Sequence, residues 1–174
     1  MPEFSNKEAN NAIGWYAISV QPNFEARTAT DLQNLGFRVF YPRTSEWNRL
    51  KRVRPLFPGY VFAYFEPTGI DQFKVLQARG AVSIVCDRIR RPEPVDPVQI
   101  QVLQRLVNSG LPLSRHPEQA AGDHIRIKCG VLSGIEGRLV RDRNECRLVV
   151  TLDLLGQSAS VQVPTSAELE RFIA

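Results

Sequence analysis

Five basic residues gather in a short stretch of the first half of the chain, directly before a run of aromatic residues. They are Arg43, Arg49, Lys51, Arg52 and Arg54, with Trp47 among them and Glu46 as the one acid. Guanidinium and ammonium groups contact phosphates, and an aromatic ring can stack on an unpaired base. The stretch therefore indicates nucleic-acid contact, although a solvated hairpin would have a similar composition.

The sequence shows no pattern typical of catalysis or metal binding. The histidines, His116 and His124, are interpreted as surface residues, and Gly130–Gly134 has its serine in the wrong place for a nucleophile elbow. The cysteines are odd in number and widely spaced, which favours reduced thiols over disulfides or a zinc site; they are Cys86, Cys129 and Cys146. We therefore expect no enzyme, no cofactor and no metal.

The aromatic run from Pro55 to Phe65 predicts a β-strand with two different faces. Its two prolines forbid a helix at the start, and Gly59 frees the backbone to enter the strand. The alternation then places Tyr60, Phe62 and Tyr64 on one side and Val61, Ala63 and Phe65 on the other. Sheet core is the ordinary interpretation of such a strand, and an apolar docking face beside the basic stretch is the alternative.

The elements that must position these residues fall into two groups. The first part of the chain predicts strands near 15–20, 37–41, 60–65 and 81–86, and helices near 24–35, 68–79 and 97–110. Asn23 is expected to cap the first helix, and Ile70, Phe73 and Leu76 are expected to form the apolar side of the second. From residue 121 on, short strands with glycine turns are predicted near 125–127, 137–140, 147–152 and 158–163.

These patterns predict an α+β fold: an antiparallel sheet with helices in a first domain, joined by a linker to a small β-barrel. The expected limits are a disordered leader over 1–13, the first domain over 14–110, the linker over 111–120 and the second domain over 121–174. Neither a signal layout nor an apolar stretch of membrane-spanning length is found, so the cytoplasm is the expected location.

The positive charge is unevenly distributed along the 174 residues. Residues 1–120 carry 15 Lys and Arg against 11 Asp and Glu, whereas residues 121–174 carry seven of each. All of the net charge of +4 therefore lies in the first part. This segregation indicates two modules with different roles, of which the first contacts an acidic partner.

Two motifs resemble one known family. Trp15-Tyr16, the run Pro55-Leu-Phe-Pro-Gly-Tyr-Val-Phe62 and Arg79-Gly80 resemble the N-terminal domain of NusG-type transcription elongation factors. The later run Gly122-Asp-His-Ile-Arg-Ile-x-x-Gly130-Val-Leu-x-Gly134-Ile-x-Gly137 resembles the KOW motif that such factors carry after a linker. The resemblance covers nearly everything from Gly14 onward and implies a non-enzymatic factor that binds RNA polymerase.

The resemblance also implies roles for individual residues of the first domain. Positions that match the family's docking pocket for the clamp helices of the largest polymerase subunit are Tyr60, Phe62, Ile100 and Leu103; core packing is the alternative for the last two. Arg79 matches a DNA-contacting arginine. Together with Arg49, Lys51, Arg52 and Arg54 it would face the exposed non-template DNA strand.

The KOW domain of the family contacts either the ribosomal protein NusE or the termination factor Rho. Positions that resemble that contact surface are Leu132, Ile135, Leu139, Leu154, Leu155 and Gly156. Housekeeping NusG has aromatic residues in place of Leu132, Ile135 and Leu155, so the resemblance weighs against Rho binding. It favours a specialised paralogue similar to the antiterminator RfaH, although Asp71, Gln72 and Phe73 replace RfaH's His-Thr-Thr contact. We expect a monomer without membrane contact.

Two other functions are compatible with the same residues. One is an RNA- or ribosome-binding KOW protein, against which the neutral charge of the second part argues. The other is a protein–protein adaptor without nucleic-acid contact.

Overall fold

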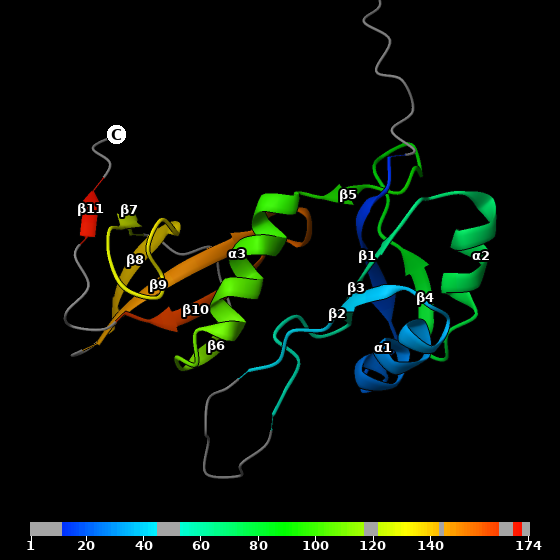
Figure 1. The fold of residues 1–174 in the computed structure, drawn as a ribbon, viewed down its shortest axis with the longest axis horizontal. Coiled ribbons are helices and arrows are strands. Elements are labelled where there is room, and N and C mark those ends of the chain that lie inside the picture. Colours follow the sequence, from blue (N-terminus) through cyan, green and yellow to red (C-terminus); the bar gives the residue numbers. More distant parts are fainter. Residues whose placement is uncertain (1–11, 45–52, 117–121, 143–144, 164–168, 172–174) are drawn as a thin grey trace, which may run out of the picture. The chain divides into compact units, whose positions relative to one another are not determined.

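The computed structural model describes residues 12–44, 53–116, 122–142, 145–163 and 169–171 (Figure 1). The chain divides into two compact units. Unit 1 comprises residues 1–40 and 59–95, and unit 2 comprises residues 41–58 and 96–174. By this division the third helix belongs with unit 2, whereas the sequence placed it in the first domain. The domain limits inferred from the sequence stay a prediction.

Unit 1 contains a five-stranded antiparallel sheet. Its strands are β1 (Gly14–Val20), β2 (Arg38–Phe40), β3 (Tyr60–Phe65), β4 (Ala81–Ile84) and β5 (Pro94–Val95). Their order is β2-β3-β1-β4, and β5 also pairs with β1. The register places Trp15 opposite Tyr64 and Phe62 opposite both Ala17 and Phe40. The four predicted strands are confirmed, the second and fourth of them shorter than expected, and β5 was not predicted.

Helices α1 (Glu25–Asn34) and α2 (Gly69–Leu76) accompany this sheet (Figure 1). Contrary to the sequence prediction, Asn23 does not cap α1. It takes a left-handed φ of 67°, and Phe24 is the N-cap, without a side-chain hydrogen bond. Asparagine tolerates this conformation better than most residues, so Asn23 turns the chain into the helix instead of capping it. In α2 the hydroxyl of Thr68 accepts a hydrogen bond from the Asp71 amide at 3.3 Å, as a capping residue should.

The side of α2 that carries Ile70, Phe73 and Leu76 is not its buried side. Ile70, Phe73 and Leu76 are 70%, 65% and 43% exposed. The helix instead buries Val75, with Ala78 just beyond its end. Both sets have helical spacing, and the smaller side chains pack against the body of unit 1.

Unit 2 combines one helix with a second antiparallel sheet of six strands. Helix α3 (Pro97–Asn108) begins with Asp96, whose carboxylate accepts from the Val98 amide at 2.8 Å. The strands are β6 (Leu113–His116), β7 (Asp123–Ile127), β8 (Glu136–Asp142), β9 (Glu145–Leu152), β10 (Gln157–Gln162) and β11 (Leu169–Arg171), with a 3-10 turn η1 (Asp153–Leu155) before β10. Their order is β11-β7-β8-β9-β10-β6. The predicted α+β class, with antiparallel sheets and three helices, is confirmed for the described residues.

Part of the expected linker is a strand. Leu113–His116 forms β6 and pairs with β10. Leu113 is buried, and the hydroxyls of Ser114 and Ser160 lie 2.9 Å apart across the two strands. The segment was missed because its single apolar residue produces almost no alternation. Among the described residues, no helix has the length and apolar character needed to cross a membrane.

Candidate functional site

The chain enters the aromatic strand through a tightly held turn at Gly59. This glycine has a φ of 82°, a left-handed conformation that a residue with a Cβ adopts only with strain. Its carbonyl accepts from the Val20 amide at 2.8 Å, and its amide donates to Glu25 Oε1 at 3.0 Å. Glu25 is a buried carboxylate in the first turn of α1. This role of Glu25 could not be predicted from local sequence patterns, because the two residues are 34 positions apart.

The base of the basic stretch is a short paired segment within unit 2. Arg43 forms an isolated antiparallel bridge with Pro55, and the Thr44 amide donates to the Arg54 carbonyl at 2.8 Å. The Arg54 amide in turn donates to the Thr44 hydroxyl at 3.2 Å. Arg54 is exposed, and the described ends of the basic stretch pair with each other in an antiparallel arrangement. Arg49, Lys51, Arg52 and Trp47 lie outside the described residues.

One side of the sheet in unit 1 carries a cluster of aromatic rings, which we call the aromatic face: Trp15, Phe40, Tyr60, Phe62 and Tyr64. Trp15 packs edge-on against Tyr64 and Phe40, with ring centroids 5.5 and 6.4 Å apart. Phe40 lies 6.1 Å from Phe62. Tyr60, Tyr64 and Phe40 are partly exposed. This face can therefore offer aromatic surface to a partner.

An arginine covers part of the aromatic face. The Arg38 guanidinium lies 5.0 Å from the ring centre of Tyr64 and 5.7 Å from that of Trp15. Such cation–π contacts contribute about 0.5–1 kcal/mol at exposed sites. Sequence reasoning missed Arg38. Its signal was the alternation of Arg38 with Phe40 in β2, which puts both on the side of the sheet that carries the aromatic residues.

Three of the four residues proposed for polymerase docking are buried. Phe62 is 0% exposed, and Ile100 and Leu103 are 1% exposed. Tyr60 alone of the four is partly exposed. Core packing, which was kept open for Ile100 and Leu103, therefore accounts for their burial.

Arg79 is held by a carboxylate of α1. Its Nε and Nη2 donate to the two oxygens of Asp31, both at 2.8 Å, and its amide donates to the same carboxylate at 3.1 Å. The hydrogen bond from Arg79 lowers the pKa of Asp31 to about 2, and the same contact raises the pKa of Arg79. The Thr28 hydroxyl also donates to the Arg79 carbonyl at 2.6 Å. A proposed DNA-contacting arginine is therefore bound in an ion pair within the protein.

The residues proposed as the KOW partner surface fall into two groups. Leu132, Ile135 and Leu139 are buried. Leu154 and Leu155 are partly exposed in η1, and Gly156, with a φ of 60°, follows them at the surface. Only the segment 154–156 is therefore accessible to a partner in this structure.

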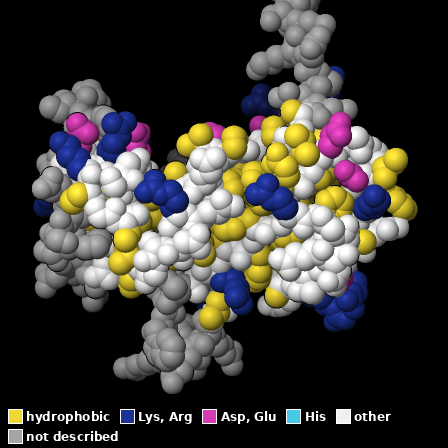
Figure 2. Space-filling model, in the orientation of Figure 1, with side chains coloured by type: hydrophobic (Ala, Val, Ile, Leu, Met, Phe, Trp, Pro, Cys, Tyr) yellow, Lys and Arg dark blue, Asp and Glu magenta, His cyan; other side chains and the backbone are white. Residues whose placement is uncertain are grey.

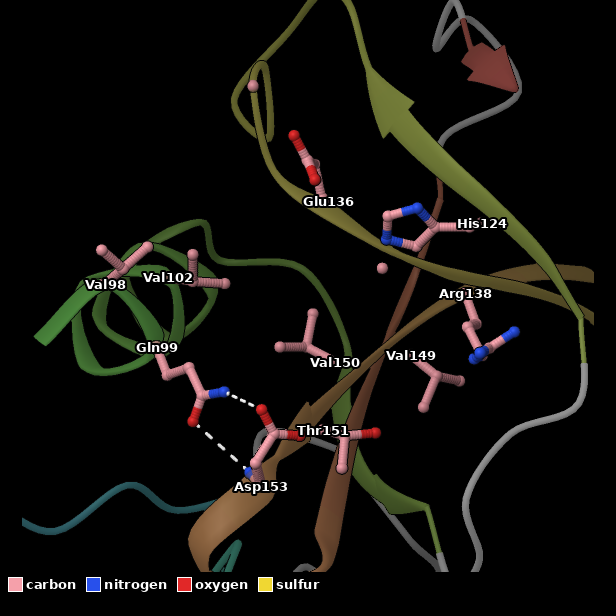
Figure 3. Close-up of a pocket in the computed structure, with 12 residues that line it drawn as sticks. Val98, Gln99, Val102, His124, Glu136, Arg138, Val149, Val150, Thr151 and Asp153 are labelled. Carbon is pink, nitrogen blue, oxygen red and sulfur yellow. Dashed lines mark hydrogen bonds between the residues drawn. The ribbon is translucent and has the colours of Figure 1, made fainter. Parts of the chain in front are cut away.

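Unit 2 also contains an open pocket of about 600 Å³ between α3 and strands β7 to β9 (Figure 3). Val98 and Val102 come from α3, and Val149 and Val150 come from β9. Gln99 reaches across at one end, where its amide donates to Asp153 Oδ2 at 2.6 Å. His124, Glu136 and Arg138 lie at the other end. The described residues contain no group of His, Cys, Asp and Glu arranged to hold a metal ion.

Comparisons with known proteins give the context for these surfaces. The family model described as "Transcription termination factor nusG" matches residues 14–104, more than half of the chain. A solved structure described as "Domain interaction in Thermotoga maritima NusG" has a similar fold, with a TM-score of 0.57 and 19% sequence identity. The alignment covers 93% of this chain and 98% of that chain. The comparison of the sequence with curated proteins found no match.

Two structures of the MjSpt4:Spt5 complex also align. Conformation B gives a TM-score of 0.33 at 15% identity and covers 91% of this chain and 97% of that chain. Conformation A gives a TM-score of 0.30 at 18% identity and covers 90% and 98%. The family match supports a general role in transcription elongation. From the match over residues 14–104, the chain belongs to the NusG family of transcription factors.

Proposed function

We propose that this chain is a non-enzymatic elongation and antitermination factor that binds RNA polymerase through unit 1 and suppresses pausing and termination. The observation that carries the proposal is a family match that spans the whole aromatic face, from Trp15 in β1 to Tyr64 in β3. Aromatic side chains are the usual anchors of protein interfaces. The partner would be the clamp helices of the largest polymerase subunit, as the resemblance implies.

Burial changes which residues can act as anchors. Tyr60 and Tyr64 are partly exposed, whereas Phe62 is covered. We therefore assign first contact to the two tyrosines and a supporting position to Phe62. Arg54, at the base of the basic stretch, would lie on the nucleic-acid side, and the non-template strand is the proposed ligand there.

A pull-down with RNA polymerase tests the docking proposal. Tyr60→Ala removes a partly exposed ring and should weaken polymerase binding at least tenfold, within the range expected of an interface anchor. Tyr60→Phe keeps the ring and should bind as the parent does. Circular dichroism verifies that both variants fold. Equal binding of Tyr60→Ala and the parent protein would remove the aromatic face as the docking surface.

For the second half of the chain we propose a KOW barrel that recruits a further factor. The glycines of its motif support this: Gly130 and Gly134 have left-handed φ values of 82° and 80° at the turn before β8. A Cβ on Gly137 would lie 2.5 Å from the backbone carbonyl oxygen of Val149, so only glycine fits there. The exposed segment Leu154–Gly156 is the proposed contact.

NusE is the proposed partner of this segment, and Rho is not, because aliphatic residues replace the aromatic ones of housekeeping NusG. These departures also support a specialised, RfaH-like role. Leu154→Ser with Leu155→Ser should weaken capture of purified NusE, and Val82→Ser, at an exposed position of unit 1, is the matched control. If the parent protein captures purified Rho and not NusE, the proposed partner of this segment is wrong. Cosedimentation with ribosomes without polymerase would favour the RNA-binding alternative.

A further inference from the structure

A second arginine-rich element lies in unit 1, at the turn between β4 and β5. We call residues Asp87–Arg91 the arginine turn; it carries Arg88, Arg90 and Arg91 around Ile89. All three arginines are exposed, and Ile89 is 66% exposed. The element is separate in sequence from the basic stretch 43–54 and from the aromatic face. Figure 2 shows one face of the molecule, and on the part of each unit visible there the Lys and Arg side chains form separate groups.

The backbone of this turn is closed by hydrogen bonds. The Asp87 amide donates to the Arg91 carbonyl at 2.8 Å, and the Arg90 amide donates to the Asp87 carbonyl at 3.1 Å. Cys86 and Pro92 form a bridge directly beneath. Arg90 has a φ of 62°, a conformation that glycine or asparagine would adopt at lower cost. A turn that keeps an arginine in this conformation presents that side chain at a local energetic cost.

The acid of the turn contacts its backbone and forms no ion pair with the described arginines. Asp87 Oδ1 accepts from the amides of Ile89 and Arg91, both at 2.9 Å, so this carboxylate organises the backbone. Among the residues that the structure describes, no carboxylate lies within ion-pair distance of the three guanidinium groups, whereas those of Arg79 and Arg126 are both paired. The turn therefore presents three guanidinium groups without an ion-pair partner among the described residues, and its three arginines and one aspartate give it a net charge of +2 on a preorganised backbone.

We propose that the arginine turn is a nucleic-acid-binding element that contacts the phosphodiester backbone independently of sequence. A guanidinium group binds phosphate oxygens through two parallel N–H donors, and a preorganised turn loses little entropy when it binds. A uniformly charged polyanion suits three adjacent cations better than a protein segment of mixed charge does. The excess positive charge of the whole chain also lies in its first 120 residues. Ile89 at the tip can pack against sugar carbons.

The proposal goes beyond polymerase docking, and nucleic-acid binding by the full chain alone tests it. Fluorescence anisotropy with labelled duplex DNA, single-stranded DNA and RNA of about 20 residues would be measured from about 50 to 300 mM salt. The variant Arg88→Gln, Arg90→Gln, Arg91→Gln should bind more weakly. Each lost duplex phosphate contact makes the negative slope of log affinity against log salt shallower by about 0.9. It also weakens the affinity at 0.1 M salt about eightfold.

Two further variants make the result specific. The variant Arg115→Gln, Lys128→Gln, Arg141→Gln removes the same charge from exposed positions of unit 2 and should keep the parent slope. Arg90→Gly removes one cation and relieves the left-handed conformation, so it should lose about one contact without loss of thermal stability. Circular dichroism checks all variants.

An unchanged salt slope in the triple variant of the turn would overturn the proposal. Competition would overturn it too: if an acidic peptide displaces DNA at an equal concentration of negative charge, the turn is a protein-binding element. Polymerase pull-down separates this test from that of the proposed function. The turn variant should still bind polymerase, and Tyr60→Ala should keep the parent salt slope.

Discussion

Phe62→Ala distinguishes a core side chain from a docking anchor. The ring of Phe62 is 0% exposed, lies opposite Ala17 of β1 and packs 6.1 Å from the ring of Phe40. Burial of such a side chain contributes about 1.5–3 kcal/mol, and the aromatic pair adds about 0.5–1.5 kcal/mol. Truncation also leaves a cavity, so the free energy of unfolding of unit 1 should fall by about 3–5 kcal/mol.

Urea denaturation followed by tryptophan fluorescence measures this loss, since Trp15 belongs to the same face. With an m-value of about 2 kcal/mol/M, the midpoint should move down by about 2 M. Tyr60→Ala removes a ring that is already partly in water and should cost about 1–2 kcal/mol, less than Phe62→Ala. Phe62→Leu, which keeps an apolar side chain, should lie between the two.

Polymerase binding supplies the refuting result. If Phe62 is core, the binding defect of Phe62→Ala follows its stability and recovers at low temperature, where unit 1 remains folded. If Phe62→Ala instead loses less than about 1 kcal/mol of stability but abolishes binding, the reasoning from burial is wrong. Phe62 would then be a contact residue that the partner uncovers.

Three further predictions concern the contact between α1 and the turn after α2. Gly80→Ala should destabilise unit 1 by about 2–4 kcal/mol in urea, because Gly80 has a φ of 86° and its new methyl would lie 2.7 Å from Cγ of Phe24; a neutral result would contradict the packing. Thr28→Val leaves the Arg79 carbonyl without its 2.6 Å donor and should cost about 1–3 kcal/mol, with Thr28→Ser as the control that keeps the hydroxyl. Asp31→Asn should free the Arg79 guanidinium and, if Arg79 contacts DNA, strengthen DNA binding. Since the folded pKa of Asp31 is about 2, below its ordinary 3.8, the ion pair stabilises the fold above about pH 4 and this contribution disappears toward pH 2. When stability is followed while the pH is lowered from about 4 to 2, the Asp31→Asn variant should lose less free energy of unfolding than the parent protein does.

Much of the fold could be predicted from local patterns. The alternation in β1, β3 and β9 and the proline after Asp96 at the start of α3 are signals carried by neighbouring residues. Two kinds of feature could not be predicted in this way. Helical spacing showed that Ile70 and Phe73 share a side of α2, but not that this side faces water, since packing against the rest of the unit selects the buried side. Strand β6 was missed because its single apolar residue gives no alternation, and only its pairing with β10, more than 40 residues further along the chain, makes it a strand.

The candidate site divides in the same manner. Sequence alone determined that aromatic residues alternate along β3, that cations precede it and that the chain carries the motifs of the NusG family. Only the tertiary structure decided that Phe62 is covered while Tyr60 is accessible, and that Asp31 holds Arg79 from 48 positions away. It also decided that the Asp87 carboxylate binds backbone amides, so that the cations of the arginine turn have no ion-pair partner among the residues that the structure describes. The physical reason is that residue type specifies which interactions a side chain can make, whereas strand register and packing decide which partner is within reach.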